Sequence, residues 1–168
     1  MDAVAFSNGP NSVRIVRKEG EIEVRRPDLD ARVCSYHLIS GQDPVGYAGT
    51  VPTDMLSGKD YPSRAWFEAT ADTEFPDLLP QILTYFDAER VPDLLVFAAP
   101  GWDLGHKWKA GHGGLRPAEM HVPLILAGPG VPKGQLPTAR AVDILPTIME
   151  LLGKKTDNNL DGQSILKR

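Results

Sequence analysis

The sequence is poor in cysteine, in long apolar runs and in positive charge, and each shortage excludes a class of protein. Cys34 is the one cysteine among 168 residues, so the chain can form neither an internal disulfide nor a zinc site with two thiolates of its own. The apolar run at residues 94–99 is far too short to cross a bilayer. Residues 1–8 lack the basic flank and the apolar segment of a signal peptide. We therefore expect a cytoplasmic chain that has no membrane partner.

The charge balance argues against one further class of partner. Eighteen Lys and Arg residues stand against 22 Asp and Glu residues, which gives a formal net charge of −4. Because binding to a nucleic-acid backbone depends on a basic surface, we do not expect it here. The composition, 42% hydrophobic and 24% charged, is typical of a globular protein. Glycine and proline are abundant, at 16 and 15 residues, which predicts many turns and long irregular connections.

The first third of the chain has the pattern of β structure. In residues 13–25, valine and isoleucine alternate with charged side chains on both sides of a glycine-containing turn, which predicts a hairpin with one apolar face. Residues 4–6 are expected to pair beside this hairpin, and residues 34–38 to form a further short strand. Residues 46–63 show no periodicity and predict a long loop that is either functional or mobile.

The pattern changes to alternating helix and strand after residue 63. Apolar residues recur at helical spacing in residues 78–86 and 143–152. Residues 94–98 and 122–127 are continuous apolar runs, which are typical of strands buried on both faces. The second part of the chain therefore predicts an α/β fold.

Five side chains in this part are expected to have structural roles. Asp77 and Asp143 precede the predicted helices and are the expected N-caps. Trp66 is expected to anchor the core, as buried aromatic residues usually do. Thr147 is interpreted as a residue of the last helix rather than as a nucleophile, and His121 as a packing residue rather than as a metal ligand.

One loop concentrates the side chains that can carry chemistry. Residues 99–119 follow a predicted buried strand, and open α/β sheets bind their ligands at the carboxyl ends of such strands. Asp103, His106 and His112 lie in this loop among glycines, and one carboxylate with two imidazoles suits a divalent metal such as zinc. The alternative is a loop whose polar side chains merely face water. The spacing of the three residues matches no familiar ligand motif, so spacing alone does not choose between the two.

Several short motifs follow one another in residues 111–164. They are Gly111-His112-Gly113, Val122-Pro123-Leu124, Gly128-Pro129-Gly130, Asp143-Ile144-Leu145-Pro146-Thr147, Leu151-Leu152-Gly153 and Asp161-Gly162-Gln163-Ser164. In this order they resemble the C-terminal signature of the alkaline phosphatase superfamily, which includes type I phosphodiesterases/nucleotide pyrophosphatases and arylsulfatases.

The resemblance implies a fold, a reaction and a set of site residues. It implies part of an alkaline-phosphatase-like α/β sandwich, and a site of two divalent metals that binds a phosphate or sulfate ester. His112 matches one of the family's metal ligands, zinc is the expected metal, and His106 and Asp103 are further candidate ligands. Gly113 and Gly114 are candidate substrate-binding residues, because they leave room for a bulky ester and offer backbone N–H groups to its anionic oxygens. The expected substrate is a phosphate ester of the phosphodiesterase or nucleotide pyrophosphatase kind.

The sequence also departs from the family's pattern. The strand at residues 94–98 ends in Ala99-Pro100-Gly101, where the family has Asp-His-Gly with two metal ligands. The family's Asp-x-x-x-His pair is absent, and the nucleophile near the start of its fold has no counterpart. We therefore expect a single domain over residues 1–168 that is the C-terminal portion of such a protein. In it, residues 1–63 form a β-rich insertion-like region and residues 64–168 the C-terminal α/β part.

Two functions stay open for this chain. It can be one part of a metal-dependent phosphate-ester hydrolase, without a catalytic residue of its own and without turnover as an isolated polypeptide. Alternatively, it can be a degenerate, non-catalytic binding or assembly module that keeps the fold. In both cases an incomplete sheet exposes a strand edge or an apolar face such as that of residues 94–98, so we expect self-association.

Overall fold

The computed structural model describes residues 2–30, 32–105, 113–136, 138–156 and 159–166. Its strands are β1 (Ala3–Ser7), β2 (Ser12–Val16), β3 (Gly20–Arg25), β4 (Val33–Gly41), β5 (Tyr61–Pro62) and β6 (Leu95–Phe97). Its helices are α1 (Ser63–Thr70), α2 (Leu78–Tyr85), α3 (Pro117–Met120) and α4 (Ile144–Leu151), with a 3-10 turn, η1 (Ala141–Asp143), before α4. The chain divides into two compact units, Met1–Val122 and Pro123–Arg168. No helix in the described ranges is long and apolar enough to cross a membrane.

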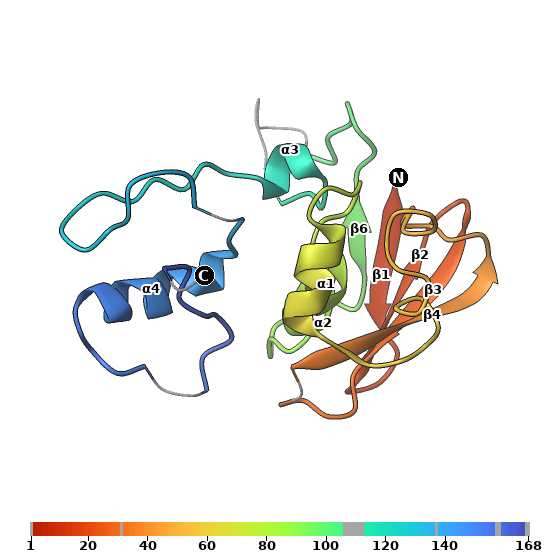
Figure 1. The fold of residues 1–168 in the computed structure, drawn as a ribbon. Coiled ribbons are helices and arrows are strands. Elements are labelled where there is room, and N and C mark those ends of the chain that lie inside the picture. Colours follow the sequence, from red (N-terminus) through yellow and green to blue (C-terminus); the bar gives the residue numbers. More distant parts are fainter. Residues whose placement is uncertain (1, 31, 106–112, 137, 157–158, 167–168) are drawn as a thin grey trace. The chain divides into compact units, whose positions relative to one another are not determined.

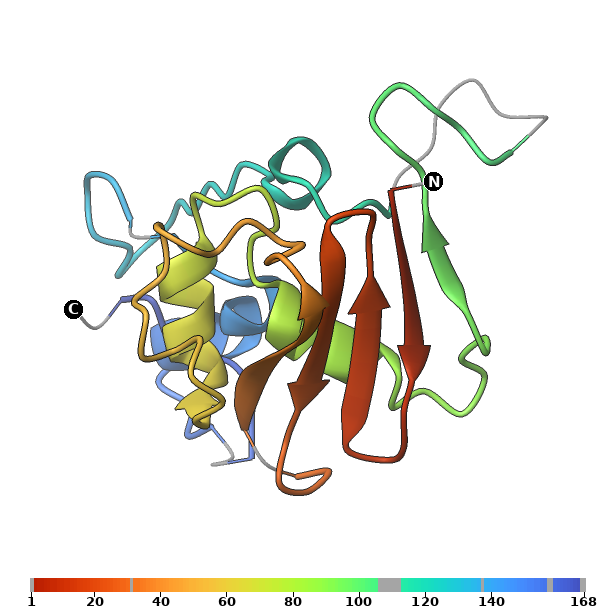
Figure 2. The ribbon, with the colours of Figure 1, turned by 90° about the vertical axis from the view of Figure 1, so that its right-hand side faces the viewer.

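The strands form one antiparallel sheet in the order β5-β4-β3-β2-β1-β6 (Figure 2). Strands β1 to β4 follow one another along the chain, and β6 returns to pair with β1 at one edge. In the central hairpin Val13 lies opposite Val24 and Ile15 lies opposite Ile22, as the alternation of the sequence predicts. The β structure predicted for the first third is confirmed, because a period of two on neighbouring strands fixes both the pairing and the buried face.

Helices α1 and α2 lie against one face of this sheet (Figure 1). Helix α2 packs on β2, β3 and β4, while α1 packs on α2 and β5. The apolar positions that recur along α2 join those of the strands in one core cluster. Its fully buried large aliphatic members are Val13, Ile15, Ile22, Val24, Val45, Leu78 and Leu79. The structure is therefore mixed α/β, with an antiparallel sheet covered by helices on one side.

Trp66 is the centre of an aromatic cluster beneath the sheet. Its side chain is fully buried, and its Nε1–H donates to the Cys34 carbonyl oxygen at 2.8 Å. The Tyr47 ring stacks on it with centroids 6.4 Å apart, and the Tyr61 ring meets it edge-on at 6.3 Å. The expected anchoring role of Trp66 is confirmed, and α1 owes its place to this residue.

The predicted loop before α1 is irregular but well packed. No helix or strand occurs between β4 and β5. The Asp43 carboxylate organises its first turn, accepting hydrogen bonds from the N–H of Val45 at 3.0 Å and of Ala48 at 2.7 Å. The Tyr36 hydroxyl donates to the same carboxylate at 3.0 Å. Buried side chains in this loop are Val45, Tyr47, Val51 and Met55. The loop thus belongs to the core of the first unit.

The strand predicted at residues 94–98 forms, but it is not buried on both faces. Leu94 is 58% exposed and Val96 is 39% exposed, while Phe97 is buried at 9%. Within the described ranges β6 is an edge strand, whose one neighbour, β1, runs antiparallel to it. A continuous apolar run predicts burial on both sides, but only the arrangement of neighbouring strands decides whether the second face is covered.

The prediction of a second buried strand, at residues 122–127, is wrong. The segment has no strand assignment, and Val122 and Ile125 are 77% and 87% exposed. A strand exists only where a neighbour accepts and donates its backbone hydrogen bonds. The part of the chain that the structure describes contains no such neighbour for this segment.

Neither predicted N-cap makes a side-chain cap bond to its helix. Asp143 precedes α4 but makes no such bond to it; its carboxylate instead accepts from the Arg140 N–H at 2.9 Å, within the preceding turn η1. Asp77 has a left-handed backbone, with φ 54°, and makes no side-chain cap bond to α2. Its N–H donates to the Thr70 hydroxyl at 2.9 Å, and its carboxylate accepts from Gln81 Nε2 at 3.0 Å. The N-cap predictions are therefore wrong, because both carboxylates accept from other donors than the first backbone N–H groups of the helix.

Two of the sequence motifs, at residues 143–147 and 161–164, are joined by close contacts inside the second unit. The Thr147 hydroxyl is buried, donates to the Asp143 carbonyl oxygen at 2.6 Å and accepts from the Ile165 N–H at 3.2 Å. Gly162 approaches the backbone so closely that a Cβ there would lie 1.9 Å from the Val142 carbonyl oxygen. These contacts fasten the end of the chain to α4, and they give the Asp-Ile-x-Pro-Thr and Asp-Gly-x-Ser motifs a structural role.

Candidate functional site

The loop that follows β6 carries the predicted metal ligands. Asp103 is exposed, and its Oδ1 accepts a hydrogen bond from the Gly105 N–H at 2.8 Å, so a tight turn orients this carboxylate. His106 and His112 lie outside the described residues. Across the ranges that the structure does describe, no three His, Cys, Asp or Glu side chains come together as a metal site would need. The ligand set Asp103, His106 and His112 therefore stays a prediction.

The predicted substrate-binding glycines lie in contrasting surroundings. Gly113 has a φ of +108°, which favours glycine, and nothing lies within 4 Å of where its Cβ would be. At Gly114 the corresponding position is occupied, since Glu119 Oε2 lies 1.3 Å from it. A side chain at residue 114 would therefore have to displace the Glu119 carboxylate.

Glu119 is a residue that the sequence analysis did not select. Its carboxylate comes from α3, whose N-terminal residue Pro117 follows the glycines by a few residues. A negative charge beside Gly114 repels a bare anion, whereas a cation bound nearby would neutralise it. The local electrostatics therefore disfavour a bare anion at Gly114. The signal in the sequence was that Glu119 lies close to Gly113 and Gly114 along the chain. That proximity alone does not show that its carboxylate lies against Gly114.

Two large apolar side chains in the same loop face solvent. Trp102 is 77% exposed and Leu104 is 61% exposed. The Trp102 N–H donates to the Ala99 carbonyl oxygen at 3.0 Å, which makes a turn directly after β6.

A second cluster of reactive groups lies on the sheet face opposite the helices. His37 Nε2 is 3.1 Å from the Ser35 hydroxyl, and Glu23 lies directly opposite His37 on the neighbouring strand. Burial, followed by the positive charge of Arg25, lowers the pKa of His37. The Ser35 side chain is only 3% exposed, so an ester cannot reach its hydroxyl. A Cβ at Gly58 would lie 3.1 Å from the His37 ring. The distance between the Ser35 hydroxyl and the His37 ring is that of a nucleophile–base pair. Because Ser35 is buried, we assign the pair a structural role.

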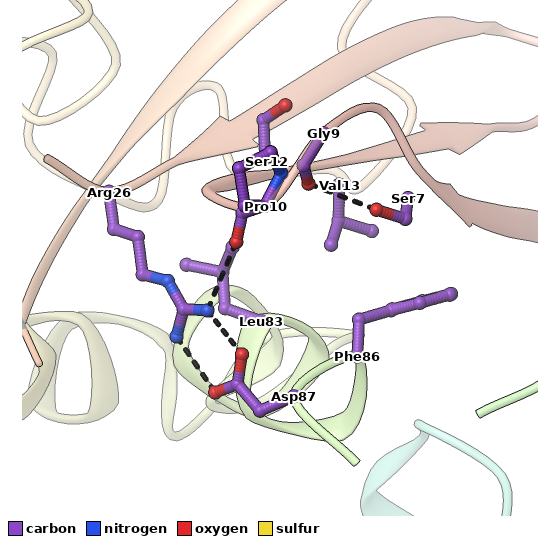
Figure 3. A pocket seen from close by; sticks show the side chains of 9 residues that line it. All are labelled: Ser7, Gly9, Pro10, Ser12, Val13, Arg26, Leu83, Phe86 and Asp87. Carbon is purple, nitrogen blue, oxygen red and sulfur yellow. Dashed lines mark hydrogen bonds and ion pairs between the residues drawn. The ribbon is translucent and has the colours of Figure 1, made fainter. Parts of the chain in front are cut away.

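A shallow pocket is lined by Ser7, Gly9, Pro10, Ser12, Val13, Arg26, Leu83, Phe86 and Asp87 (Figure 3). Arg26 and Asp87 form an ion pair in it, with Nη1 and Oδ2 2.8 Å apart. The hydrogen bonds that Arg26 donates to the Asp87 carboxylate raise the pKa of Arg26, against the opposing effect of burial. A volume of about 40 Å³ holds about one water molecule. The pocket is too small for a phosphate ester, and its guanidinium is already neutralised.

Comparisons with known proteins give one relationship. The chain is 32% identical over 101 residues to the multifunctional alkaline phosphatase superfamily protein PehA of Trinickia caryophylli, an alignment that covers 56% of this chain and 20% of that protein. The chain thus spans about a fifth of the length of the curated relative that it matches. No family model matches the sequence, and no solved structure matches the chain. The similarity supports a distant relationship to hydrolases of the alkaline phosphatase superfamily.

Proposed function

We propose that this chain is the C-terminal part of a metal-dependent phosphate-ester hydrolase of the alkaline phosphatase superfamily. The observation that carries the proposal is the 32% identity to a protein of that superfamily. The collinear order of motifs from Gly111-His112-Gly113 to Asp161-Gly162-Gln163-Ser164 supports it further. A phosphodiesterase or nucleotide pyrophosphatase-like activity, an α/β sandwich of the superfamily type and a phosphate-ester substrate belong to the same proposal.

The residues of the loop fit a divalent cation by their chemistry. Asp103 presents an exposed carboxylate, and Glu119 adds a second one beside Gly114. With the imidazoles of His106 and His112, these are the donors that zinc takes in proteins. A bound cation would supply Lewis-acid polarisation of the ester oxygens. The chain's own contribution is to hold the carboxylates and to leave open space at Gly113, where no side chain obstructs the ester.

Hydrolysis by the isolated chain is expected to be absent. The chain has no matched nucleophile, and the strand that precedes the loop ends in Ala99-Pro100-Gly101 in place of two metal ligands. Purified chain should therefore not release nitrophenol from nitrophenyl phosphate mono- or diesters with zinc, manganese or magnesium added. Metal-dependent turnover that the substitution His112→Ala abolishes would contradict this expectation.

Zinc binding separates the hydrolase part from the alternative, a non-catalytic binding or assembly module. We expect stoichiometric zinc in the purified chain by elemental analysis, and its loss in His112→Ala, because one imidazole is removed from a small ligand set. His121→Ala is the matched control, since His121 is exposed at the end of α3. Absence of zinc from the wild-type chain, or equal zinc in both variants, favours the module.

Self-association is the second property that we propose. No strand of the described residues pairs with the outer edge of β6, where Val96 is 39% exposed, and open edges invite pairing with a second copy. Sedimentation should give a dimer, and Val96→Lys should shift it to monomer, because a charge on the edge opposes pairing. Val16→Lys is the control, at 36% exposure on the interior strand β2. A monomeric wild-type chain at high concentration would contradict the proposal.

A further inference from the structure

The loop between β6 and α3 is closed at its base by Asp2. The Asp2 N–H donates to the Phe97 carbonyl oxygen at 2.8 Å, at the last residue of β6. Its carboxylate Oδ2 accepts from Arg116 Nη2 at 2.7 Å and from Arg116 Nε at 3.2 Å, directly before α3. Both ends of the loop therefore meet on one residue, and Leu115 adds a contact with the core cluster.

Arg116 is fixed from several sides. Its guanidinium carbon lies 5.0 Å from the centroid of the Phe75 ring, and it forms an ion pair with Glu74. The Phe75 side chain is 2% exposed, so the ring is a rigid support for the cation. Arg116 thus ties the end of the loop to the turn before α2 as well as to Asp2.

Arg17 holds Asp2 in place for this contact. Arg17 Nη2 donates to Asp2 Oδ1 at 2.8 Å, while Arg116 uses Oδ2. The Arg17 guanidinium carbon also lies 4.9 Å from the Phe75 centroid. Burial opposes ionisation of Asp2, but the hydrogen bonds from both arginines outweigh it, so its pKa is lowered. Each carboxylate oxygen therefore serves one guanidinium, and Asp2 cannot turn toward one without losing the other.

The ion pair between Asp2 and Arg116 is largely shielded from water, unlike an ordinary surface ion pair. The side chains of Asp2 and Arg116 are 11% and 25% exposed. Exposed pairs contribute little because water screens them and both side chains must be ordered. Here Phe75 and Arg17 already order the partners, and two hydrogen bonds from one guanidinium add direction. A fixed Arg116 in turn limits where the preceding residues Gly113 and Gly114 can lie.

We propose that Arg116 is a positioning residue for the phosphate ester: its ion pair with Asp2 closes the loop at its base and holds Gly113 and Gly114 in place for the anionic oxygens. The proposal rests on the proposed function, since it assigns the substrate to the backbone of these glycines. Arg116 does not touch the ester. It acts through the chain segment that it fixes.

Two substitutions of Arg116 test the proposal in the whole chain. Arg116→Gln removes the charge, and Arg116→Lys keeps the charge but loses the paired hydrogen bonds. In Arg116→Gln the amide hydrogens of Glu119 and Met120, which both donate to the Arg116 carbonyl oxygen at 2.9 Å, should exchange about tenfold faster. The exchange of the β2 and β3 amides should stay as in the wild type. Arg116→Lys should restore most of the protection.

The control is Arg14→Gln, which removes an arginine paired with Glu21 and 29% exposed. This variant should leave the exchange of Glu119 and Met120 unchanged. Unchanged exchange in Arg116→Gln overturns the positioning role. Equal acceleration in the loop and in all strands also overturns it, because the residue would then serve the stability of the whole unit.

Inorganic phosphate with zinc is the probe for the functional part. Titration followed by the amide resonances of Gly113 and Gly114 should show binding to the wild type, and about tenfold weaker binding to Arg116→Gln. Equal phosphate affinity in both proteins overturns the positioning proposal while the proposed function stands. If no glycine resonance responds in the wild type, the proposed phosphate site fails, and the exchange experiment still decides whether Arg116 fixes the loop.

Discussion

Replacing Trp66 by alanine is expected to lower the free energy of unfolding by about 4 kcal/mol. The indole is fully buried between Tyr47 and Tyr61. Its removal leaves a large cavity and also leaves the Cys34 carbonyl oxygen without its 2.8 Å hydrogen bond from Nε1. Because a domain of this size is stable by about 5–15 kcal/mol, the loss takes a large share of the total.

Chemical denaturation monitored by circular dichroism measures this effect. Trp102→Ala is the matched control, because the same side chain is removed at a position that is 77% exposed. Its effect should stay within about 0.5 kcal/mol. A small loss in Trp66→Ala would mean that the aromatic cluster does not carry the packing of α1 against the sheet.

Residues 123–168 are expected not to fold on their own, whereas residues 1–122 are expected to fold without them. The described members of the core cluster all belong to the first unit. Among the described residues of the second unit, the one large apolar side chain that is buried is Ile165, at 3% exposure. A chain shorter than about 70–80 residues rarely gains enough from its core to fold without further support.

Helix α4 of the second unit also leaves much of its apolar surface exposed. Ile144, Leu145 and Ile148 of α4 are 40%, 52% and 44% exposed, so much of its apolar surface contributes nothing to burial within the unit. A helix of eight residues is also too short to be stable in water by itself.

Thermal unfolding and far-ultraviolet circular dichroism of the two separate polypeptides provide the measurement. The polypeptide 1–122 should unfold cooperatively, and 123–168 should show the spectrum of a disordered chain. The full chain with the substitution Thr147→Val is compared with the wild-type full chain, because the substitution removes the hydroxyl that accepts the Ile165 N–H. Cooperative unfolding of isolated 123–168 would show that the hydrogen bonds of Asp143 and Thr147 are sufficient to fold this segment without a larger core.

Short-range patterns predicted the first half of the fold well. The hairpin of β2 and β3 and the strand β4 after it follow from a period of two in the sequence, and the strand β1 follows from the turn at residues 8–11 that precedes the hairpin. Helices α2 and α4 follow from apolar residues at helical spacing. Helix α1 was not predicted, because Ser63–Thr70 has only two large apolar residues, Trp66 and Phe67, and these are adjacent rather than at helical spacing.

The candidate site was predicted only in outline. The sequence pointed to the loop after β6 and to Asp103, Gly113 and Gly114 within it, and the structure places Asp103, exposed, in a tight turn of this loop. The sequence did not reveal Glu119 above Gly114, nor the closure of the loop by Asp2. Both depend on side-chain directions that residue spacing does not report.

The sequence by itself determined the strands and helices whose residues interact with close neighbours along the chain, and its motifs indicated the superfamily that the comparison with PehA also supports. Only the tertiary structure decided that β6 is an exposed edge, that residues 122–127 have no partner strand among the described residues, and that Asp2 meets Arg116. Periodicity records which residues face one side of an element, since that depends on local backbone geometry. Periodicity does not record which element covers that side or which residue pairs with a charged side chain. These depend on contacts between distant parts of the chain, such as Asp2 and Arg116, which are more than a hundred residues apart.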